Sequence, residues 1–120
     1  MKTENENIIL QKAKAFAIRC VKLHQYLQKD KKEYCLSNQM IRSGTSIGAN
    51  AKEAIRAQSL SDFRSKLYIS LKEASETEYW LELLRDTEYL TTEQAANMLD
   101  DCIELIKIIT SILKSTEKQA

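Results

Sequence analysis

The sequence has no proline and only two glycines in 120 residues, where average composition would give about six and eight. β-Sandwiches, barrels and βαβ units need turn residues at short, regular intervals, so this shortage argues against all of them. The longest strongly apolar stretch, residues 102–113, is interrupted by Glu104 and Lys107, which argues against a membrane-spanning helix. The composition therefore predicts an all-α protein with no membrane partner.

Histidine and cysteine are also scarce. His24 is the only histidine, and the three cysteines form no Cys-x-x-Cys pair. The N-terminal stretch MKTENENIIL is polar and shows no export signal. An odd number of unpaired thiols without such a signal predicts a reduced, cytoplasmic protein.

These shortages argue against catalysis. A serine or cysteine nucleophile would need His24 as its base, and no glycine-rich phosphate loop is present. Glu73 and Glu76 lie one turn apart, but no histidine or third carboxylate supports a metal site there. We expect a protein that is not an enzyme, with no catalytic residue, metal, cofactor or small-molecule substrate.

Apolar residues recur at alternating spacings of four and three, the pattern of amphipathic helices. Four such segments are predicted, at about residues 5–28, 36–57, 60–87 and 92–116. Because the links between them are short, neighbouring helices should be antiparallel. We expect one domain, residues 1–120, folded as an up-down-up-down four-helix bundle.

The last two predicted helices carry a second apolar stripe beside the first. A helix in an isolated bundle needs one apolar face, and a tryptophan on a second face is typical of an interface. The alternative is that the two stripes form one wide apolar seam, which packs entirely within a single bundle. The residues assigned to an oligomer interface are Ile69, Tyr79, Trp80, Leu83, Leu105, Ile108 and Ile112.

Charge is divided along the chain. Residues 11–72 contain 13 Lys/Arg and 4 Asp/Glu, whereas residues 73–104 contain 1 Arg and 10 Asp/Glu. Opposite charges on different parts of one molecule favour head-to-tail contacts, which close into a ring where the rotation permits. We therefore expect a cyclic homo-oligomer.

Polar residues are also expected to pair beside the seam of the second and third helices. Arg42 should meet Glu76 or Glu78 there, since charges next to a core are costly unless paired. Asn50 should bond the backbone or Glu53. We interpret this cluster, with Ser46, as a structural motif.

The basic half of the chain offers an alternative role. A ring would repeat its basic surface in every subunit, and phosphate contacts then add up, although no recognised nucleic-acid-binding module is present. The residues of this candidate surface are Lys12, Lys14, Arg19, Lys22, Lys29, Lys31, Lys32, Arg56 and Arg64.

Two blocks of sequence resemble a known family. The stretch QMIRSGTSIGANAKEA (residues 39–54) and the stretch LKEASETEYWL (residues 71–81), preceded by Asp62, Phe63 and Lys66, are similar to its signatures in order and spacing. This is the bacterial four helix bundle protein family, also known as the 23S rRNA intervening-sequence proteins. The resemblance covers roughly residues 10–115.

The resemblance implies an antiparallel four-helix bundle that assembles as a homopentamer. Some members are encoded within intervening sequences of 23S rRNA genes, and most have no established activity. Related accessory proteins of diversity-generating retroelements are basic pentamers that bind nucleic acid, but this chain has a formal net charge of only +1. We therefore expect a non-enzymatic oligomeric scaffold or adaptor, with RNA or DNA binding as the alternative.

Overall fold

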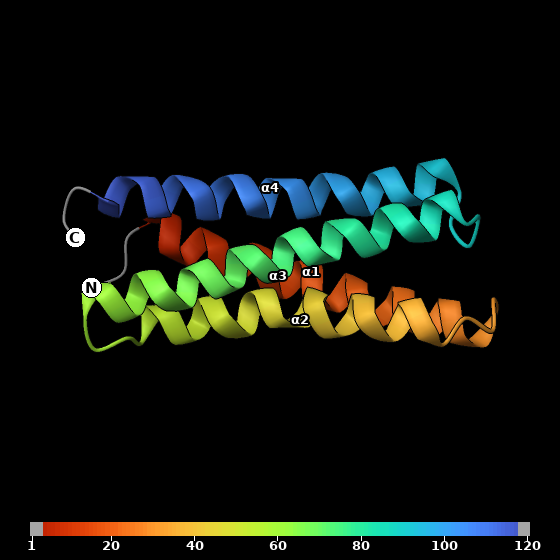
Figure 1. Cartoon of the computed structure of the whole chain (residues 1–120), viewed down its shortest axis with the longest axis horizontal. Helices are drawn as coiled ribbons and strands as arrows, with labels where there is room; N and C mark the ends of the chain where they lie inside the picture. The colour runs from red at the N-terminus through yellow and green to blue at the C-terminus, as the bar shows by residue number, and fades with distance from the viewer. Residues whose placement is uncertain (1–3, 118–120) are drawn as a thin grey trace.

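Four helices make up the part of the chain that the structure describes (Figure 1). The computed structural model describes residues 4–117, and this part of the chain contains no strand. The helices are α1 (Glu4–Lys29), α2 (Cys35–Ile55), α3 (Leu60–Asp86) and α4 (Thr92–Thr116). Each boundary lies within two residues of the one predicted from sequence. The all-α prediction is therefore confirmed.

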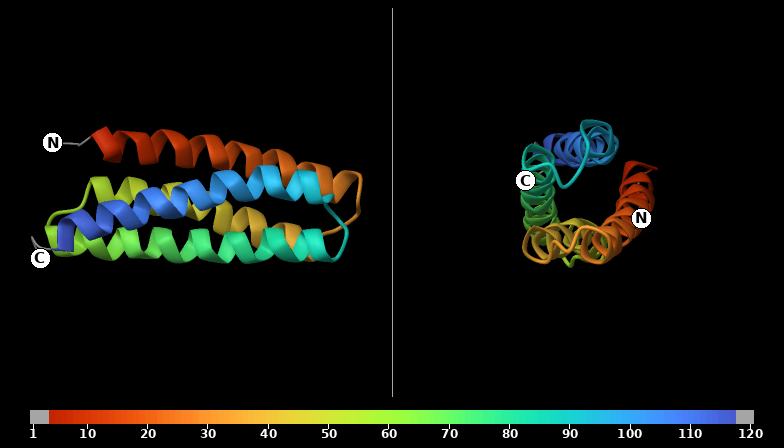
Figure 2. Two further views of the ribbon diagram at one scale, coloured as in Figure 1. Left: turned by 90° about the horizontal axis from the view of Figure 1, so that it is seen from above. Right: turned by 90° about the vertical axis from the view of Figure 1, so that its right-hand side faces the viewer.

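The helices lie side by side along a rod that measures 47 × 20 × 19 Å, and consecutive helices run in opposite directions (Figure 1). An end-on view places them at four corners in chain order (Figure 2, right). Packing is closest between α2 and α3, and loosest between α1 and α4. The bundle is therefore not four-fold regular, because one of its seams is more open than the others.

Side chains in the short links begin the helices. The carboxylate of Glu33 accepts hydrogen bonds from the backbone N–H groups of Cys35, Leu36 and Ser37, at 3.1, 2.8 and 2.6 Å. It thus satisfies the amides that a helix leaves free at its N-terminus. This buried glutamate was not singled out in the sequence.

Two hydroxyl groups cap the other links. Ser59 accepts from the Asp62 N–H at 3.1 Å and begins α3. Thr91 and Gln94 form a full reciprocal capping box at the start of α4. These caps fix the points at which the chain turns back.

The predicted apolar stripes of the helices form the core. On α1, Leu23 of the predicted apolar stripe is partly buried and packs against the core. The other members of that stripe are each 1% exposed or less: Ile9, Ala13, Phe16, Cys20 and Leu27. The helix α2 continues without a break through both of its glycines. The seam pattern therefore identified the face that each helix turns inward.

Candidate functional site

The predicted ion pair lies across the outer edge of the α2–α3 seam. Arg42 on α2 pairs with Glu76 on α3, and its Nη1 lies 3.4 Å from Oε1 of Glu73. The indole Nε1 of Trp80 lies 3.5 Å from the same Glu76 carboxylate. Glu78, the alternative partner, forms no ion pair with Arg42, and its charge instead contributes to raising the pKa of Cys102 on α4. The arrangement fixes α2 against α3 at the surface.

The rest of the polar motif stays close to the backbone. Asn50 donates to the Ser46 carbonyl at 2.8 Å, and the Ser46 hydroxyl donates to the Arg42 carbonyl at 2.7 Å. Glu53 lies 3.3 Å from Nζ of Lys66 on α3. The Asn50 and Ser46 bonds stay on the surface of α2, whereas Glu53 and Lys66 line an open cavity of about 490 Å³ between the end of α2 and the start of α3. The contacts link backbone and neighbouring helices, which is the geometry of a structural motif.

Two of the residues assigned to an oligomer interface lie in the core. Leu105 is 1% exposed and Ile112 is 4% exposed, although no second chain is present. The prediction that they anchor a contact between copies is therefore wrong. In a bundle each helix contacts two neighbours, so the second stripe of α4 packs within its own subunit. For these positions, the wide-seam alternative is correct.

The other members of the predicted interface reach the surface. Ile69 is 39% exposed and Tyr79 is 57% exposed. The half-buried Trp80 packs against the core and makes an edge-to-face contact with Tyr79, with ring centroids 5.2 Å apart. Leu83 and Ile108 are half-buried. An apolar strip, which consists of Ile69, Tyr79, Trp80 and Leu83, therefore runs along the outside of α3.

The predicted basic residues do not converge on one rim. Lys29, Lys31 and Lys32 lie at the end of the rod where α1 joins α2, whereas Arg56 and Arg64 lie at the opposite end (Figure 1).

Three of the predicted basic residues are also engaged within the chain. Lys12 pairs with Glu104, and Arg19 pairs with Asp101 and donates to Asn97. Arg64 donates to the Leu113 carbonyl at 2.7 Å. These bonds reduce the positive charge available to a polyanion.

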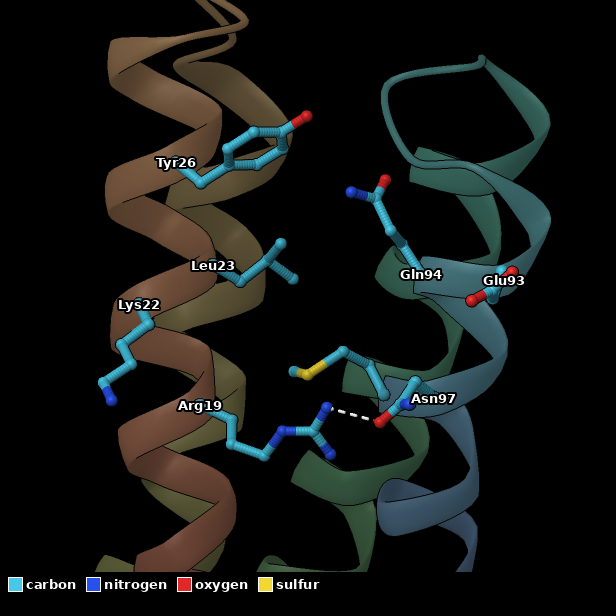
Figure 3. A pocket seen from close by; sticks show the side chains of 8 residues that line it. Arg19, Lys22, Leu23, Tyr26, Glu93, Gln94 and Asn97 are labelled. Carbon is cyan, nitrogen blue, oxygen red and sulfur yellow. Dashed lines mark hydrogen bonds between the residues drawn. The ribbon is translucent and has the colours of Figure 1, made fainter.

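The loosest seam contains a cleft of about 420 Å³ (Figure 3). Tyr26 from α1 and Gln94 from α4 point toward one another across it, and the Arg19–Asn97 hydrogen bond closes its lower end (Figure 3). Leu23 and Met98 supply apolar surface between them. The cleft is shallow and open, and no metal-binding group of three His, Cys, Asp or Glu side chains exists in the described residues.

A second surface was missed by the sequence analysis. Ile18 and Val21 of α1 are 49% and 38% exposed, and they lie near a groove between α1 and α2 of about 290 Å³. Their spacing of three places them on one side of the helix, away from the buried Phe16 and Cys20. An apolar pair off the seam was the available signal.

The two core thiols, Cys20 and Cys102, are not reactive centres. Burial raises the pKa of Cys20 to about 12, and burial, with the charge of Glu78, raises the pKa of Cys102 to about 12. The thiol of Cys102 also donates to the Ala74 carbonyl at 3.2 Å. Cys35 alone is exposed. Both core thiols therefore stay protonated and act as small apolar groups.

The model of the family described as 23S rRNA-intervening sequence protein matches residues 5–111. The chain belongs to this family. It is 51% identical to a protein of unknown function from the S23 ribosomal protein family of Bacteroides thetaiotaomicron VPI-5482, whose crystal structure superposes with a TM-score of 0.91. The match covers 92% of this chain and 98% of the other. No curated protein matches the chain.

None of the helices within residues 4–117 combines the length and the apolar character needed to cross a membrane.

Proposed function

We propose that this member of the family is a non-enzymatic scaffold that works as a homo-oligomer. The observation that carries the proposal is the apolar strip on α3, where Ile69 and Tyr79 remain 39% and 57% exposed beside Trp80 and Leu83. Apolar side chains left exposed on one helix face, here interleaved with Glu73 and Glu76, are a feature of sites of protein association. A cyclic assembly of identical subunits would cover this strip in every copy.

The charge distribution supports association between copies. Cations predominate from residue 11 to 72 and anions from residue 73 to 104, so a subunit offers complementary partners to its neighbours. A ring of five, which the family resemblance implies, would need head-to-tail contacts between neighbouring subunits. Because the formal net charge is only +1, little overall repulsion opposes their approach.

Several features also favour a role without catalysis. The one histidine is held by polar neighbours, with its Nε2 2.8 Å from Asn38 Oδ1 and 2.9 Å from Gln28 Nε2. Both core thiols are protonated at neutral pH because their pKa is about 12. Neither arrangement activates a nucleophile.

Light scattering coupled to size exclusion tests the proposal. We expect a mass that is a multiple of the 13.8 kDa subunit, with five copies as the specific expectation. We also expect dissociation to increase at high salt, since exposed charges are then screened. A monomer at micromolar concentration and physiological salt contradicts the proposal.

The variant Trp80→Ala is expected to raise the dissociation constant of the assembly by about tenfold or more. Large aromatic residues contribute most of the binding energy at interfaces, so their truncation is costly. Folding should suffer less, since Trp80 is only half-buried. Trp80→Phe, which keeps an aromatic ring, is the matched control. An unchanged mass distribution for Trp80→Ala, over a dilution series, would remove this residue from the interface.

Binding of RNA or DNA is a second candidate function. Of the nine predicted basic residues, those with no ion pair or hydrogen bond to a side chain within the described part of the chain are Lys14, Lys22, Lys29, Lys31, Lys32 and Arg56. A polarisation titration with structured RNA and duplex DNA should then show affinity that falls steeply with salt. Absence of binding at low ionic strength leaves only the scaffold.

A further inference from the structure

We propose that the groove between α1 and α2 receives Tyr79 of a second copy of this chain. The inference rests on the proposed oligomeric scaffold and specifies which two surfaces meet. Its starting point is the groove itself, which has a volume of about 290 Å³. The residues that line it are Leu10, Ala13, Lys14 and Ala17 of α1, with Thr45, Gly48, Ala49 and Lys52 of α2.

The groove exists because the facing side chains are small. Ala13, Ala17, Gly48 and Ala49 cannot fill the surface between two helix backbones, and a Cβ on Gly48 would lie only 3.3 Å from the Ala13 Cβ. The helices therefore approach closely and leave an apolar hollow above the contact. The hollow has room for an aromatic side chain, a group of the kind that anchors interfaces.

The rim of the groove is positively charged. Lys14 and Lys52 are exposed on its two sides, and neither forms an ion pair within the described part of the chain. Ile18 and Val21 extend the apolar surface along α1. The fitting occupant is an aromatic side chain with carboxylates beside it, because these would meet the two ammonium groups.

The chain itself presents such an occupant. Three tyrosines are more than half exposed, at positions 34, 68 and 79. Tyr68 lies under the Arg64 guanidinium, 5.7 Å from its ring centroid, and Tyr34 follows two lysines closely. Of these three, only Tyr79 lies in the acidic part of the chain, one turn from Glu82, which forms no ion pair within the described residues. Charge complementarity therefore selects Tyr79.

The donor and the acceptor are on different sides of the bundle. The groove lies between α1 and α2, and α3 occupies the corner diagonal to α1 (Figure 2, right). Tyr79 stands midway between the buried Thr77 and Leu81, so it projects away from the core. A subunit cannot fill its own groove. Each copy offers one donor and one acceptor, which is a head-to-tail contact.

One side chain is not an entire interface. A stable contact buries on the order of 800 Å² on each partner, whereas an aromatic residue contributes about 150–250 Å². Tyr79 is therefore the anchor. Ile18 and Val21 beside the groove, and Leu83 beside the tyrosine, provide adjoining apolar area.

Truncation of the anchor is the first test. We expect Tyr79→Ala to raise the dissociation constant of the assembly by about 30-fold, as loss of a central aromatic does. Tyr68→Ala is the matched control, because Tyr68 is 51% exposed on the same helix. Equal effects of both variants, or no effect of Tyr79→Ala, would overturn the inference. Circular dichroism establishes that each variant is folded.

Crosslinking is the second test, and it reports directly which two surfaces meet. Ala49→Cys places a thiol in the groove, and Ser75→Cys places one a turn before Tyr79; both positions are exposed. The background is Cys35→Ser, since Cys20 and Cys102 are buried. With a short bismaleimide, the double variant should give a ladder of covalent multimers. Each single variant should stay monomeric on a denaturing gel.

The outcomes separate the inference from the proposal on which it rests. A wild-type monomer by light scattering overturns both. A wild-type oligomer whose double variant gives no ladder overturns the inference and leaves the scaffold standing. Crosslinking by Ser75→Cys alone shows that like surfaces meet, which also contradicts a head-to-tail contact.

Discussion

The α2–α3 seam is closed by small side chains and buried hydrogen bonds, whereas the α1–α4 seam is bridged by exposed ion pairs. On the first, the Ser70 hydroxyl donates to the Ile47 carbonyl at 2.7 Å, and the Thr77 and Ser43 hydroxyls lie 2.8 Å apart. These three hydroxyl-bearing residues are fully buried. Polar groups at such depth are tolerated because each is paired.

On the second seam, Arg19 pairs with Asp101, and their side chains remain 37% and 44% exposed. A cleft lies beside this pair. Ion pairs in contact with water contribute little, typically 0–1 kcal/mol. The comparison teaches that the same bundle contains one tightly determined seam and one that polar contacts merely bridge. We expect mutations to have large effects on the first and small effects on the second.

The largest effect is expected at Gly44. Gly44 lies where α2 packs against both α3 and α1: a Cβ there would lie 3.8 Å from Cγ2 of Thr77 on α3 and 2.5 Å from the Sγ of the fully buried Cys20 on α1. Gly44→Ala should lower the free energy of unfolding by about 2 kcal/mol, since overpacking outweighs the gain in helix propensity. Urea denaturation measures the change.

Gly48→Ala is the matched control, because its Cβ would meet Ala13 at 3.3 Å beside an open groove. The free energy of unfolding of Gly48→Ala should differ from that of the wild type by less than about 0.5 kcal/mol. Adding Cys20→Ala to Gly44→Ala should restore part of the loss. Equal effects at the two glycines would contradict the close packing of α2 at Gly44.

An intermediate effect is expected at Thr77. Thr77→Val keeps the side-chain shape but removes the hydroxyl that lies 2.8 Å from both Ser43 and the Glu73 carbonyl. Loss of a buried bond should cost about 1 kcal/mol, measured by thermal and urea unfolding. The double variant Thr77→Val with Ser43→Ala should cost less than the sum of the single changes. Strict additivity would show that the two hydroxyls do not interact.

The smallest effect is expected at the α1–α4 seam. Asp101→Asn removes the partner of Arg19 and should change the unfolding free energy by less than about 1 kcal/mol at low salt. The difference should shrink further as salt is raised. A loss that exceeds the one at Thr77, or that persists in high salt, would show that this seam is as strongly determined as the α2–α3 seam.

Periodicity and capping residues were sufficient to predict the helices. The seam of α1, for example, follows directly from Ile9, Ala13, Phe16 and Cys20, because a helix repeats every 3.6 residues whatever surrounds it. The spacing of Thr91 and Gln94, three residues apart, is that of a capping box, and the structure shows this box at the start of α4. The cap supplied by Glu33 was not predicted, because a side chain that lies before the N-cap position follows no fixed spacing rule.

The candidate surfaces were predicted only in part. The partnership of Arg42 with Glu76 could be anticipated because both lie beside facing seams. Leu105 and Ile112 were misassigned, because a stripe of apolar residues does not state which neighbour covers it. Tyr79 remains exposed and is a predicted interface residue that awaits its test.

The sequence by itself determined where helices begin and end and which face of each turns inward, because propensity, periodicity and caps are local. Only the tertiary structure decided how tightly each pair of helices packs and which apolar side chains remain uncovered. Packing and exposure depend on residues that are distant in the chain: Cys20 lies against Gly44, and Arg19 pairs with Asp101. No local pattern records such pairings, since they depend on how all four helices fill one common volume.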